Sequence, residues 1–409
     1  MRKSLKTTLL ITVPLLVLAI SLLLPRVRLL TAHFLPSSSS IALRHSSTSA
    51  LSNMAFEKEL QVALLAVQRA TLLTKSVFHS HAKGTLSKND ASPVTIGDFG
   101  AQALIISALQ HNFPNDEIVA EEEAKDLREN SQLRETVWEL VQAAKLSDAQ
   151  VEKDVLGGAI SSADSMLDII DKGDSKGGSS GRIWAIDPID GTKGFLRGGQ
   201  YAVCLALMVD GDVKVGVLGC PNLPVSDSEP LKEGIGADAS DEEGRFGVLF
   251  SAVQGQGAES RPFTAGALKE GKSIQMKPLS NIADATFCES VEAGHSSQGD
   301  AANIASKLGI TKPSVRMDSQ AKYGSIARGA GDLYLRLPVR KDYQEKIWDH
   351  AAGDLIVREA GGMVTDVDGQ KLDFSHGRTL KENKGVIAAP KSVHGKVIEV
   401  VKEVLGRPT

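Results

Sequence analysis

Residues 184–192 read Trp-Ala-Ile-Asp-Pro-Ile-Asp-Gly-Thr and place two carboxylates and a hydroxyl on a turn that ends an apolar strand. Pro188 fixes its own φ at about −65° and biases the residue before it toward extended geometry. Gly191 can take a backbone conformation that is closed to residues with a side chain. Asp-Pro and Asp-Gly also occur in ordinary turns, so the rest of the chain has to show whether this turn is a binding site.

Three oxygen donors of this turn can converge on one cation. They are the carboxylates of Asp187 and Asp190 and the main-chain carbonyl of Ile189. An all-oxygen environment of this kind is what magnesium prefers. Thr192 follows directly, and its hydroxyl is either part of such a site or only a turn residue.

Three further acidic residues stand at strand ends or helix starts. Asp98 precedes the apolar helical run 101–109, Glu121 follows the apolar pair Ile118-Val119, and Asp349 precedes another helical segment. Taken singly, Asp98 and Asp349 could be helix N-caps, and Glu121 could belong to a solvated acidic run. Together with the turn, they indicate one site held on a fixed scaffold.

Four motifs resemble the magnesium-dependent, lithium-sensitive phosphatase superfamily that includes inositol monophosphatase. They are Gly97-Asp98, Glu121-Glu122, residues 187–192 and residues 348–353. The longer string 187–198, followed by residues 200–207, closely resembles the 3′(2′),5′-bisphosphate nucleotidases of that superfamily. The similarity runs from about Met54 to the C-terminus, and one departure is Gly199, where an acidic residue would be expected.

The resemblance implies a cage for two or three magnesium ions, which would cancel the charge of a phosphate monoester and lower the pKa of a coordinated water. Its ligands would be Asp98, Glu121, Asp187, the Ile189 carbonyl, Asp190 and Asp349. Asp98 and Thr192 would be the catalytic residues, with the threonine hydroxyl bonded to Asp98 and orienting the attacking water. Since no Cys, Ser or His is placed as an activated nucleophile, the attack should be in line, without a covalent phosphoenzyme.

The resemblance also implies a set of substrate-binding residues. They are Thr192, His295, Ser319, Lys322, Arg336 and Asp349. From the residues alone, His295 could be a solvated loop histidine, Ser319 a helix N-cap, and Arg336 a solvated side chain opposite an apolar face. Lys322 and Arg336 could together bind a second, uncleaved phosphate.

The expected activity is therefore magnesium-dependent removal of the 3′-phosphate of 3′-phosphoadenosine 5′-phosphate to give AMP, with similar treatment of the 5′-phosphosulfate analogue. Such an enzyme would clear a by-product of sulfate assimilation. One alternative is an inositol monophosphate or bisphosphate phosphatase with the same cage, and another is a catalytically weak nucleotide or ion sensor. Intact Asp98 and Thr192 argue against the sensor, and the continuation 193–198 argues against a dedicated inositol enzyme.

The charge balance argues against nucleic acid as a partner. Residues 1–53 contain six Lys or Arg and no Asp or Glu, which leaves 40 basic and 50 acidic residues and a net charge of −10. A chain so acidic is a poor binder of nucleic-acid phosphates. We expect a monomer that binds a small nucleotide bisphosphate. Its cysteines are too few for a disulfide framework and are expected to be reduced core residues: Cys204, Cys220 and Cys288.

The N-terminus allows three interpretations. Residues 7–25 are apolar, lie between Lys6 and Arg26, and are just long enough to cross a bilayer as a helix, although Pro14 weakens that interpretation. The Ser-rich, acid-free stretch up to residue 53 would suit a mitochondrial or other organellar transit segment, or a flexible tether. Alternatively, translation starts at Met54, and the remaining chain is a cytoplasmic catalytic core.

The coarse layout predicts a mixed α and β chain. We expect helices over 57–79 and 97–111, strands over 201–209 and 213–218 joined by Asp210-Gly211, and loops over 157–181 and 226–245. The later expected elements alternate: strand 246–253, strand 286–292, a helix near Ala301, strand 333–337, a helix after Asp349 and strand 386–389.

The fold class expected from this layout is α+β or α/β. The resemblance, and not the periodicity, implies the layered αβαβα sandwich of inositol monophosphatase, with the active site between two subdomains. We expect these subdomains to span residues 54–245, with the metal-binding motifs, and 246–409, with the nucleotide-binding residues. Residues 1–53 would form a separate leader.

Overall fold

The computed structural model describes residues 55–82, 92–227, 231, 244–340 and 342–408. The leader 1–53 and most of the loop expected over 226–245 lie outside these residues. Among the described helices, none is both long and apolar enough to cross a membrane. The predictions for the apolar stretch 7–25 are therefore not addressed by the structure.

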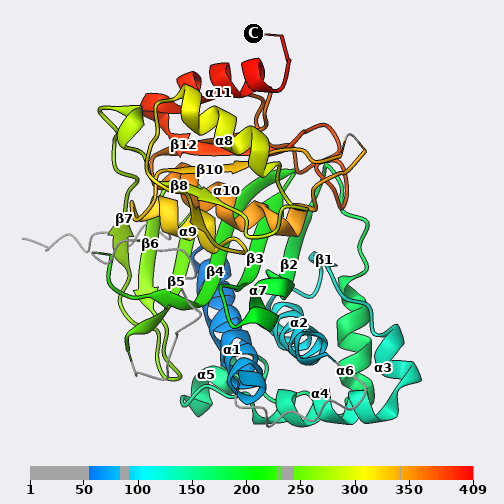
Figure 1. Cartoon of the computed structure of the whole chain (residues 1–409). Helices are drawn as coiled ribbons and strands as arrows, with labels where there is room; N and C mark the ends of the chain where they lie inside the picture. Colours follow the sequence, from blue (N-terminus) through cyan, green and yellow to red (C-terminus); the bar gives the residue numbers. More distant parts are fainter. Residues whose placement is uncertain (1–54, 83–91, 228–230, 232–243, 341, 409) are drawn as a thin grey trace, which may run out of the picture. The chain divides into compact units, whose positions relative to one another are not determined.

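Two long helices form the first layer (Figure 1). They are α1 (Glu57–Ala82) and α2 (Pro93–Asn112), which pack on each other and bury apolar side chains against the adjacent sheet. The first helix confirms the prediction. The second begins at Pro93, four residues earlier than predicted, because proline suits the first turn of a helix. Asp98 therefore lies inside α2, and the N-cap interpretation of Asp98 is wrong.

The second layer is a seven-stranded sheet in the order β1-β2-β3-β4-β5-β6-β7. Its strands are β1 (Glu117–Ala120), β2 (Arg182–Asp190), β3 (Ala202–Val209), β4 (Asp212–Pro224), β5 (Phe246–Val253), β6 (Ala258–Pro262) and β7 (Lys272–Ile274). Only the β1–β2 pair is parallel. The predicted hairpin is confirmed, since Asp210 and Gly211 both have positive φ, 51° and 75°, as a tight type I′ turn requires.

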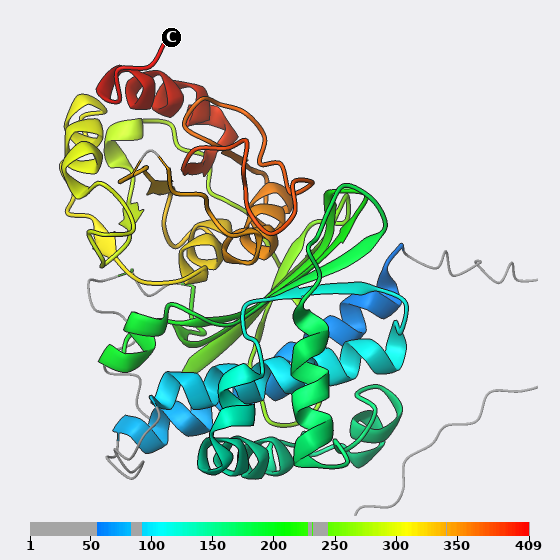
Figure 2. The same ribbon diagram turned by 90° about the vertical axis from the view of Figure 1, so that its right-hand side faces the viewer.

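Two short helices cover the other face of this sheet (Figure 2). They are α9 (Ala321–Ala327) and α10 (Ala351–Glu359), which lie opposite α1 and α2 across the strands. The contact between α10 and β4 is close, because a Cβ atom at Gly216 would lie 2.9 Å from the Ala352 carbonyl oxygen.

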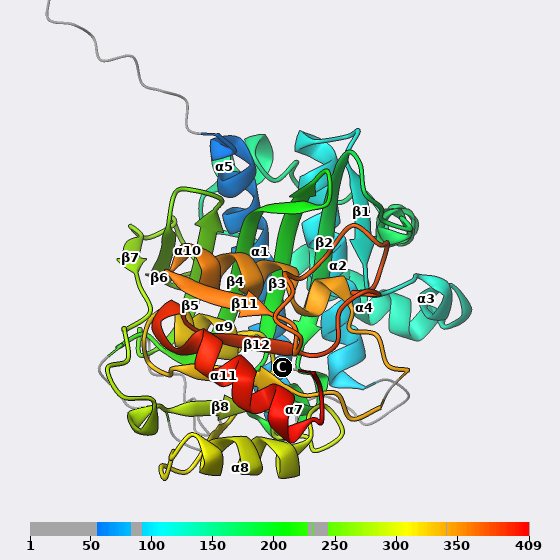
Figure 3. The ribbon, with the colours of Figure 1, turned by 90° about the horizontal axis from the view of Figure 1, so that it is seen from above.

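A five-stranded sheet and two outer helices complete the fold. The strand order is β11-β12-β10-β8-β9, and these strands run across those of the first sheet (Figure 3). The strands are β8 (Phe287–Glu289), β9 (Val315–Arg316), β10 (Leu333–Arg336), β11 (Gly362–Thr365) and β12 (Val386–Pro390). Helices α8 (Gln298–Lys307) and α11 (Lys391–Val404) pack on the outer side of this sheet. The layers therefore alternate as αβαβα, and the predicted fold class is confirmed.

The sequence did not predict every element. The segment 157–181, expected as a loop, contains α6 (Ala163–Ile170) and the 3-10 turn Asp171–Gly173, because Met166, Leu167 and Ile170 recur at helical spacing and are buried. Other helices without a prediction are α3 (Lys125–Glu129), α4 (Ser131–Ala143), α5 (Ala149–Asp154), α7 (Thr192–Arg197) and α11. Two further 3-10 turns span Ile282–Asp284 and Ile347–Asp349. The three cysteines are free and buried.

The boundary expected at residue 245 does not follow the sheets. Strands β5 to β7 lie beyond it, yet they hydrogen-bond to the first sheet through β4. We therefore propose a boundary after Ile274, and call residues 55–274 the N-terminal part and residues 275–408 the C-terminal part.

Candidate active site

The turn at the end of β2 is held in an irregular extended shape. Asp187 pairs with Cys204 and Asp190 with Ala202, so the register between β2 and β3 shifts across the two residues between the aspartates. Gly191 follows with φ of 93°, and a Cβ atom there would lie 3.0 Å from Cβ of Ser319. Glycine is thus required both by the backbone conformation and by the close approach of the C-terminal part.

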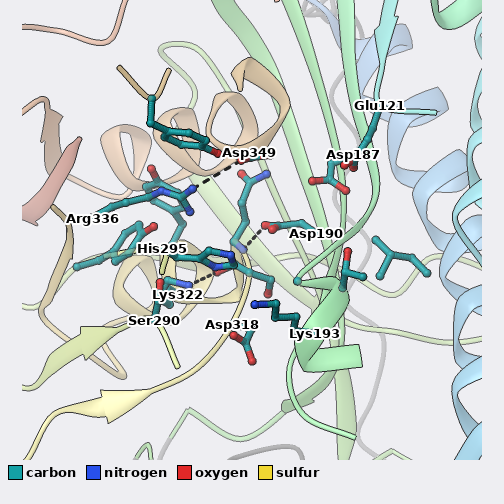
Figure 4. Close-up of a pocket in the computed structure, with 18 residues that line it drawn as sticks. Glu121, Asp187, Asp190, Lys193, Ser290, His295, Asp318, Lys322, Arg336 and Asp349 are labelled. Carbon is teal, nitrogen blue, oxygen red and sulfur yellow. Dashed lines mark hydrogen bonds and ion pairs between the residues drawn. The ribbon is translucent and has the colours of Figure 1, made fainter. Parts of the chain in front are cut away.

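The parallel pairing of β1 and β2 brings a second carboxylate beside the turn. Ala120, the last residue of β1, is in register with Ile186, so the residues that follow this pair, Glu121 and Asp187, lie side by side (Figure 4). Asp98 approaches from behind on α2. A Cβ atom at Gly97 would lie 2.6 Å from Cδ1 of Ile189, which explains why the helix needs glycine to pack against the turn.

Two of these carboxylates are buried without compensation. Asp98 is 6% exposed and Asp187 is 3% exposed. Burial, and then the charges of Glu122 and Glu121, raise the pKa of Asp98 well above its usual range. Burial, and then Glu121 and Asp190, do the same to the pKa of Asp187. One oxygen of each, Oδ1, has no hydrogen-bond partner among the described residues. Buried, unpartnered carboxylate oxygens fit a hard divalent cation.

A second acidic group lies on the other side. Ligand atoms of Glu345, Asp349 and His350 all lie within 4.8 Å of one another. Arg336 pairs with Glu345 at 2.7 Å, and the His350 ring is bonded to Tyr323 Oη at 2.8 Å. In this group the positive charge of Arg336 balances a carboxylate, whereas among the described residues no such ion pair stands beside Asp187 in the acidic turn. Asp349 lies in a 3-10 turn, one residue before the helix N-cap, so the N-cap interpretation of Asp349 is wrong.

A pocket of about 290 Å³ joins the two sides. Its walls include most of the residues that the sequence singled out: Glu121, Asp187, Ile189, Asp190, Thr192, His295, Ser319, Lys322, Arg336 and Asp349. The exception is Asp98, which lies behind the turn and whose carboxylate meets the Ile189 backbone amide. Glu121 is exposed, as expected for a solvated acidic run, but its side chain also faces the pocket beside Asp187, so the two interpretations are compatible. Thr192 lines the pocket at the start of α7, and the expected hydrogen bond to Asp98 is not formed among the described residues.

Lys322 is buried in the C-terminal wall of the pocket. Its Nζ donates to the carbonyls of Met317 and Ser319 at 3.1 and 2.9 Å and lies 5.1 Å from the centre of the Tyr334 ring. Burial lowers the pKa of Lys322 to about 8, while the negative charge of Asp190 opposes this shift. The ammonium group is thus held in place before any ligand arrives.

Arg336 is largely enclosed, with 13% of its side chain exposed, so the solvated interpretation is wrong. The predicted alternation is confirmed: Leu333, Leu335 and Leu337 pack in the outer core with α8 and α11, and Arg336 points to the pocket. Glu345 holds the guanidinium. Burial alone would raise the pKa of Glu345, but its hydrogen bond with His350 and the charge of Arg336 lower it to about 2.

The remaining predicted residues sit at the rim. Ser319 has φ of 67°, and its hydroxyl accepts from the Ala321 amide at 3.1 Å while it lines the pocket. The N-cap of α9 is the next residue, Gln320, so the N-cap interpretation of Ser319 is wrong. His295 is exposed but lines the pocket. Partial burial, and then the charge of Arg336, lower its pKa.

Sequence reasoning missed several residues of the site. The most connected is Gln320, whose amide donates to Asp190 and whose side chain bonds the Trp348 carbonyl at 2.8 Å and the Gly353 amide at 2.9 Å. Others in the wall are Lys193, Ser290, Asp318, Tyr323, Tyr334 and Tyr343. Glu345 stands in a polar run, 343–346, which contains no signal for a buried ion pair. Gln320 lies directly after Ser319, so its place in the motif was the available signal.

Comparisons with known proteins agree with this geometry. Residues 56–405 match the inositol monophosphatase family. The chain is 66% identical over 352 residues to a 3′(2′),5′-bisphosphate nucleotidase of Emericella nidulans, covering 86% of this chain and 99% of that protein. A protein of the same name from Schizosaccharomyces pombe is 50% identical over 359 residues, covering 87% of this chain and 98% of that one.

Solved structures agree on the fold. An inositol monophosphatase from Zymomonas mobilis superposes with a TM-score of 0.52 at 16% identity, covering 85% of this chain and 99% of that one. CysQ from Bacteroides thetaiotaomicron, a bacterial member of the inositol monophosphatase family, has a TM-score of 0.51 at 20% identity, covering 83% and 99%.

Proposed function

The chain belongs to the inositol monophosphatase family, and from this premise we propose that it is a phosphoric monoester hydrolase that converts 3′-phosphoadenosine 5′-phosphate to AMP and phosphate. The observation that carries the proposal is the pocket in which a cluster of carboxylates, including the unpartnered Asp187, faces two cations, Lys322 and Arg336. One wall suits divalent cations and the cleaved phosphate, and the other suits a second anionic group. The relatives at 66% and 50% identity carry the name of this activity.

The metal would be magnesium, with two or three ions held between the acidic turn, with Asp98 behind it, and Asp349 on the opposite side. The ligands would be Asp98, Glu121, Asp187, the Ile189 carbonyl, Asp190 and Asp349. When bound, magnesium neutralises phosphate charge and makes water a better nucleophile. The absence of any nitrogen or sulfur ligand in this set favours magnesium over softer metals.

The residues of the chain then position and deprotonate the attacking water. The Thr192 hydroxyl would orient the water and donate to Asp98, which lies behind the turn, although the two side chains are not hydrogen-bonded in the structure. A carboxylate with an environment that raises its pKa is suited to hold a proton. Lys322 and Arg336 would bind the phosphate that is not cleaved, and His295 at the rim would contact the base. Nε of Arg336 is a buried donor with no partner among the described residues. The guanidinium can therefore donate a hydrogen bond to a ligand in addition to its ion pair with Glu345.

Two other activities use the same cage. An inositol phosphatase differs in the ligand of the C-terminal wall, and a sensor would lack turnover. We favour the nucleotidase because two cations opposite the turn, Lys322 and Arg336, fit a second phosphate. Hydrolysis of the 5′-phosphosulfate analogue, a role in sulfate assimilation and a monomeric state belong to the same proposal.

The deciding experiment measures phosphate release from a small panel. It would contain adenosine 3′,5′-bisphosphate, its 5′-phosphosulfate analogue, adenosine 3′-monophosphate, inositol 1-phosphate and an inositol bisphosphate, each with and without magnesium. The expected result is a preference for the adenosine substrates that carry two anionic groups. A preference for either inositol phosphate would refute the nucleotide assignment, and the absence of turnover on all of them would favour the sensor.

A further inference from the structure

One arginine of the C-terminal part, Arg378, hydrogen-bonds to the end of strand β1. The Arg378 guanidinium donates to main-chain carbonyls of the N-terminal part: to Ala120 at 2.6 Å, to Ser175 at 2.9 Å and to Gly173 at 3.3 Å. Ala120 is the last residue of β1 and directly precedes Glu121. The hydrogen bonds therefore fix the backbone from which Glu121 reaches into the pocket.

The same arginine contacts the segment that carries Asp349. Its guanidinium lies 4.8 Å from the centre of the Trp348 ring, within the range of a cation–π contact. The Arg378 carbonyl accepts from the Ile347 amide at 3.2 Å, and Leu380 donates to the Glu345 carbonyl at 2.8 Å. Arg378 is thus tied to the residues just before Asp349 by its main chain as well as by its side chain.

The backbones around this contact are built to approach closely. A Cβ atom at Gly377 would lie 3.0 Å from the Lys176 carbonyl oxygen, and one at Gly177 would lie 2.9 Å from the Gly377 carbonyl oxygen. Both glycines have positive φ, 90° and 66°. Larger residues at either position would push the arginine away from β1.

We propose that Arg378 is a positioning residue that holds Glu121 and Asp349 at a fixed separation across the junction of the two parts, and so sets the affinity of the pocket for divalent cations. This inference rests on the proposed function, because it requires both carboxylates to serve one metal cage. The two carboxylates belong to different elements: Glu121 follows β1, and Asp349 lies in the 3-10 turn Ile347–Asp349. The Arg378 side chain contacts both segments, through the Ala120 carbonyl and the Trp348 ring.

Geometry and charge predict opposite effects of removing this side chain. The positive charge of Arg378 faces Glu121, Glu123 and Asp174. If the arginine acted only through its charge, its removal would leave the acidic wall more negative and strengthen cation binding. If it acts by positioning, its removal weakens cation binding, because the ligands no longer meet at one geometry.

The test measures Mn²⁺ binding to the metal-free full chain by electron paramagnetic resonance, without substrate and without turnover. Arg378→Gln removes the positive charge and the planar set of guanidinium donors. Arg378→Lys keeps the charge, but its ammonium group cannot donate to all three carbonyls in this geometry. The matched control is Arg182→Gln. Arg182 is also half-buried, pairs with Asp116 at 2.9 Å and Glu59 at 3.0 Å, and lies over the Phe113 ring, but all these partners are in the N-terminal part and away from the pocket.

We expect both Arg378 variants to lose roughly ten- to a hundredfold in Mn²⁺ affinity, the range for residues that orient metal ligands. Arg182→Gln should lower the melting temperature with little change in affinity. Should Arg378→Gln fail to fold, Arg378→Lys decides. Unchanged or tighter binding by Arg378→Lys, or an equal loss in the Arg182 control, would overturn the inference.

Asp187→Asn in the same assay separates this inference from the proposed metal cage. If Asp187→Asn weakens Mn²⁺ binding and the Arg378 variants do not, only the positioning role fails. If Asp187→Asn binds Mn²⁺ as the unchanged chain does, the cage itself is refuted, and the role of Arg378 falls with it.

Discussion

The two walls of the pocket handle buried charge in opposite ways. In the N-terminal wall and directly behind it, Asp187 and Asp98 have other carboxylates as their main charged neighbours, and one oxygen of each has no partner among the described residues. In the C-terminal wall, Arg336 is paired with Glu345 at 2.7 Å, and Lys322 donates to two carbonyls. One wall is incomplete without a ligand, whereas the other is already organised by the protein.

The difference has a physical consequence. Buried like charges destabilise a fold, so the N-terminal wall is stable only if carboxylates take up protons or a cation binds. A buried pair with its hydrogen bonds satisfied keeps its geometry whether or not a ligand is present. The comparison therefore predicts that metal binding raises the stability of the protein. The uncleaved phosphate, in contrast, would bind to side chains that are already in place.

The largest effect should come from the N-terminal wall. Asp187→Asn and Asp190→Asn keep the shape of the turn but remove hard anionic ligands, so turnover should fall by more than about a hundredfold, beyond the range for residues that only orient ligands. In the presence of a chelator, Asp187→Asn should melt no lower than the unchanged chain, because it removes a buried, uncompensated charge. Added magnesium should raise the melting temperature of the unchanged chain only.

Phosphate release and thermal melts with and without magnesium check these outcomes. Asp164→Asn is a suitable control, since this carboxylate is 85% exposed and distant from the pocket. Near-normal turnover of both Asp187→Asn and Asp190→Asn at saturating magnesium would refute the metal role of the turn.

The next effect concerns the residue between the walls. Thr192→Ala removes a hydroxyl that orients water but no strong metal ligand, so turnover should fall by roughly ten- to ten-thousandfold, the range for a positioned proton-transfer group. Magnesium affinity should change little, and Thr192→Ser should retain much of the rate. If Thr192→Ala instead loses magnesium binding and recovers its rate at high magnesium, the threonine belongs to the cage.

A smaller and more selective effect is expected in the C-terminal wall. Arg336→Ala should remove a charge-assisted contact of about 1.5 to 3 kcal/mol, or roughly ten- to more than a hundredfold in catalytic efficiency on adenosine 3′,5′-bisphosphate. The loss on adenosine 3′-monophosphate should be much smaller, because that substrate has no second phosphate. Comparing both substrates in both proteins isolates this contribution.

Arg336→Ala also leaves Glu345 buried without its cation, which destabilises the fold by itself. The double variant Arg336→Ala with Glu345→Gln separates this loss of stability from the loss of the phosphate contact. Equal losses on the two substrates would remove Arg336 from the second-phosphate site.

The smallest effect should come from residues outside both walls. A chain that begins at Met54 should keep its turnover and its magnesium dependence, because every residue of the pocket lies after it. Turnover of the shortened and full chains under identical conditions checks this. A loss of activity in the shortened chain would show that residues 1–53 support one of the walls.

The elements that the sequence predicted best are those specified by neighbouring residues. The turn 187–192 and the hairpin at Asp210-Gly211 follow from the conformational restrictions of proline and glycine, which act within a few residues. The segment 157–181 was expected to be a loop because it is rich in glycine, serine and acidic residues, yet three apolar residues at helical spacing form α6 against the core. Tertiary burial overrode a weak local preference there.

The sequence by itself determined which chemistry the chain carries, because the carboxylates of the turn, Glu121, Asp349, the Thr192 hydroxyl and the cations Lys322 and Arg336 could be named before the structure. Only the tertiary structure decided which charges are compensated. Arg336 meets Glu345 through a run with no motif, and Arg378 meets Ala120 across 258 positions of the chain. Pairing of this kind depends on how strands and layers assemble, because the energy of a buried charge is set by the groups packed around it and not by its neighbours along the chain.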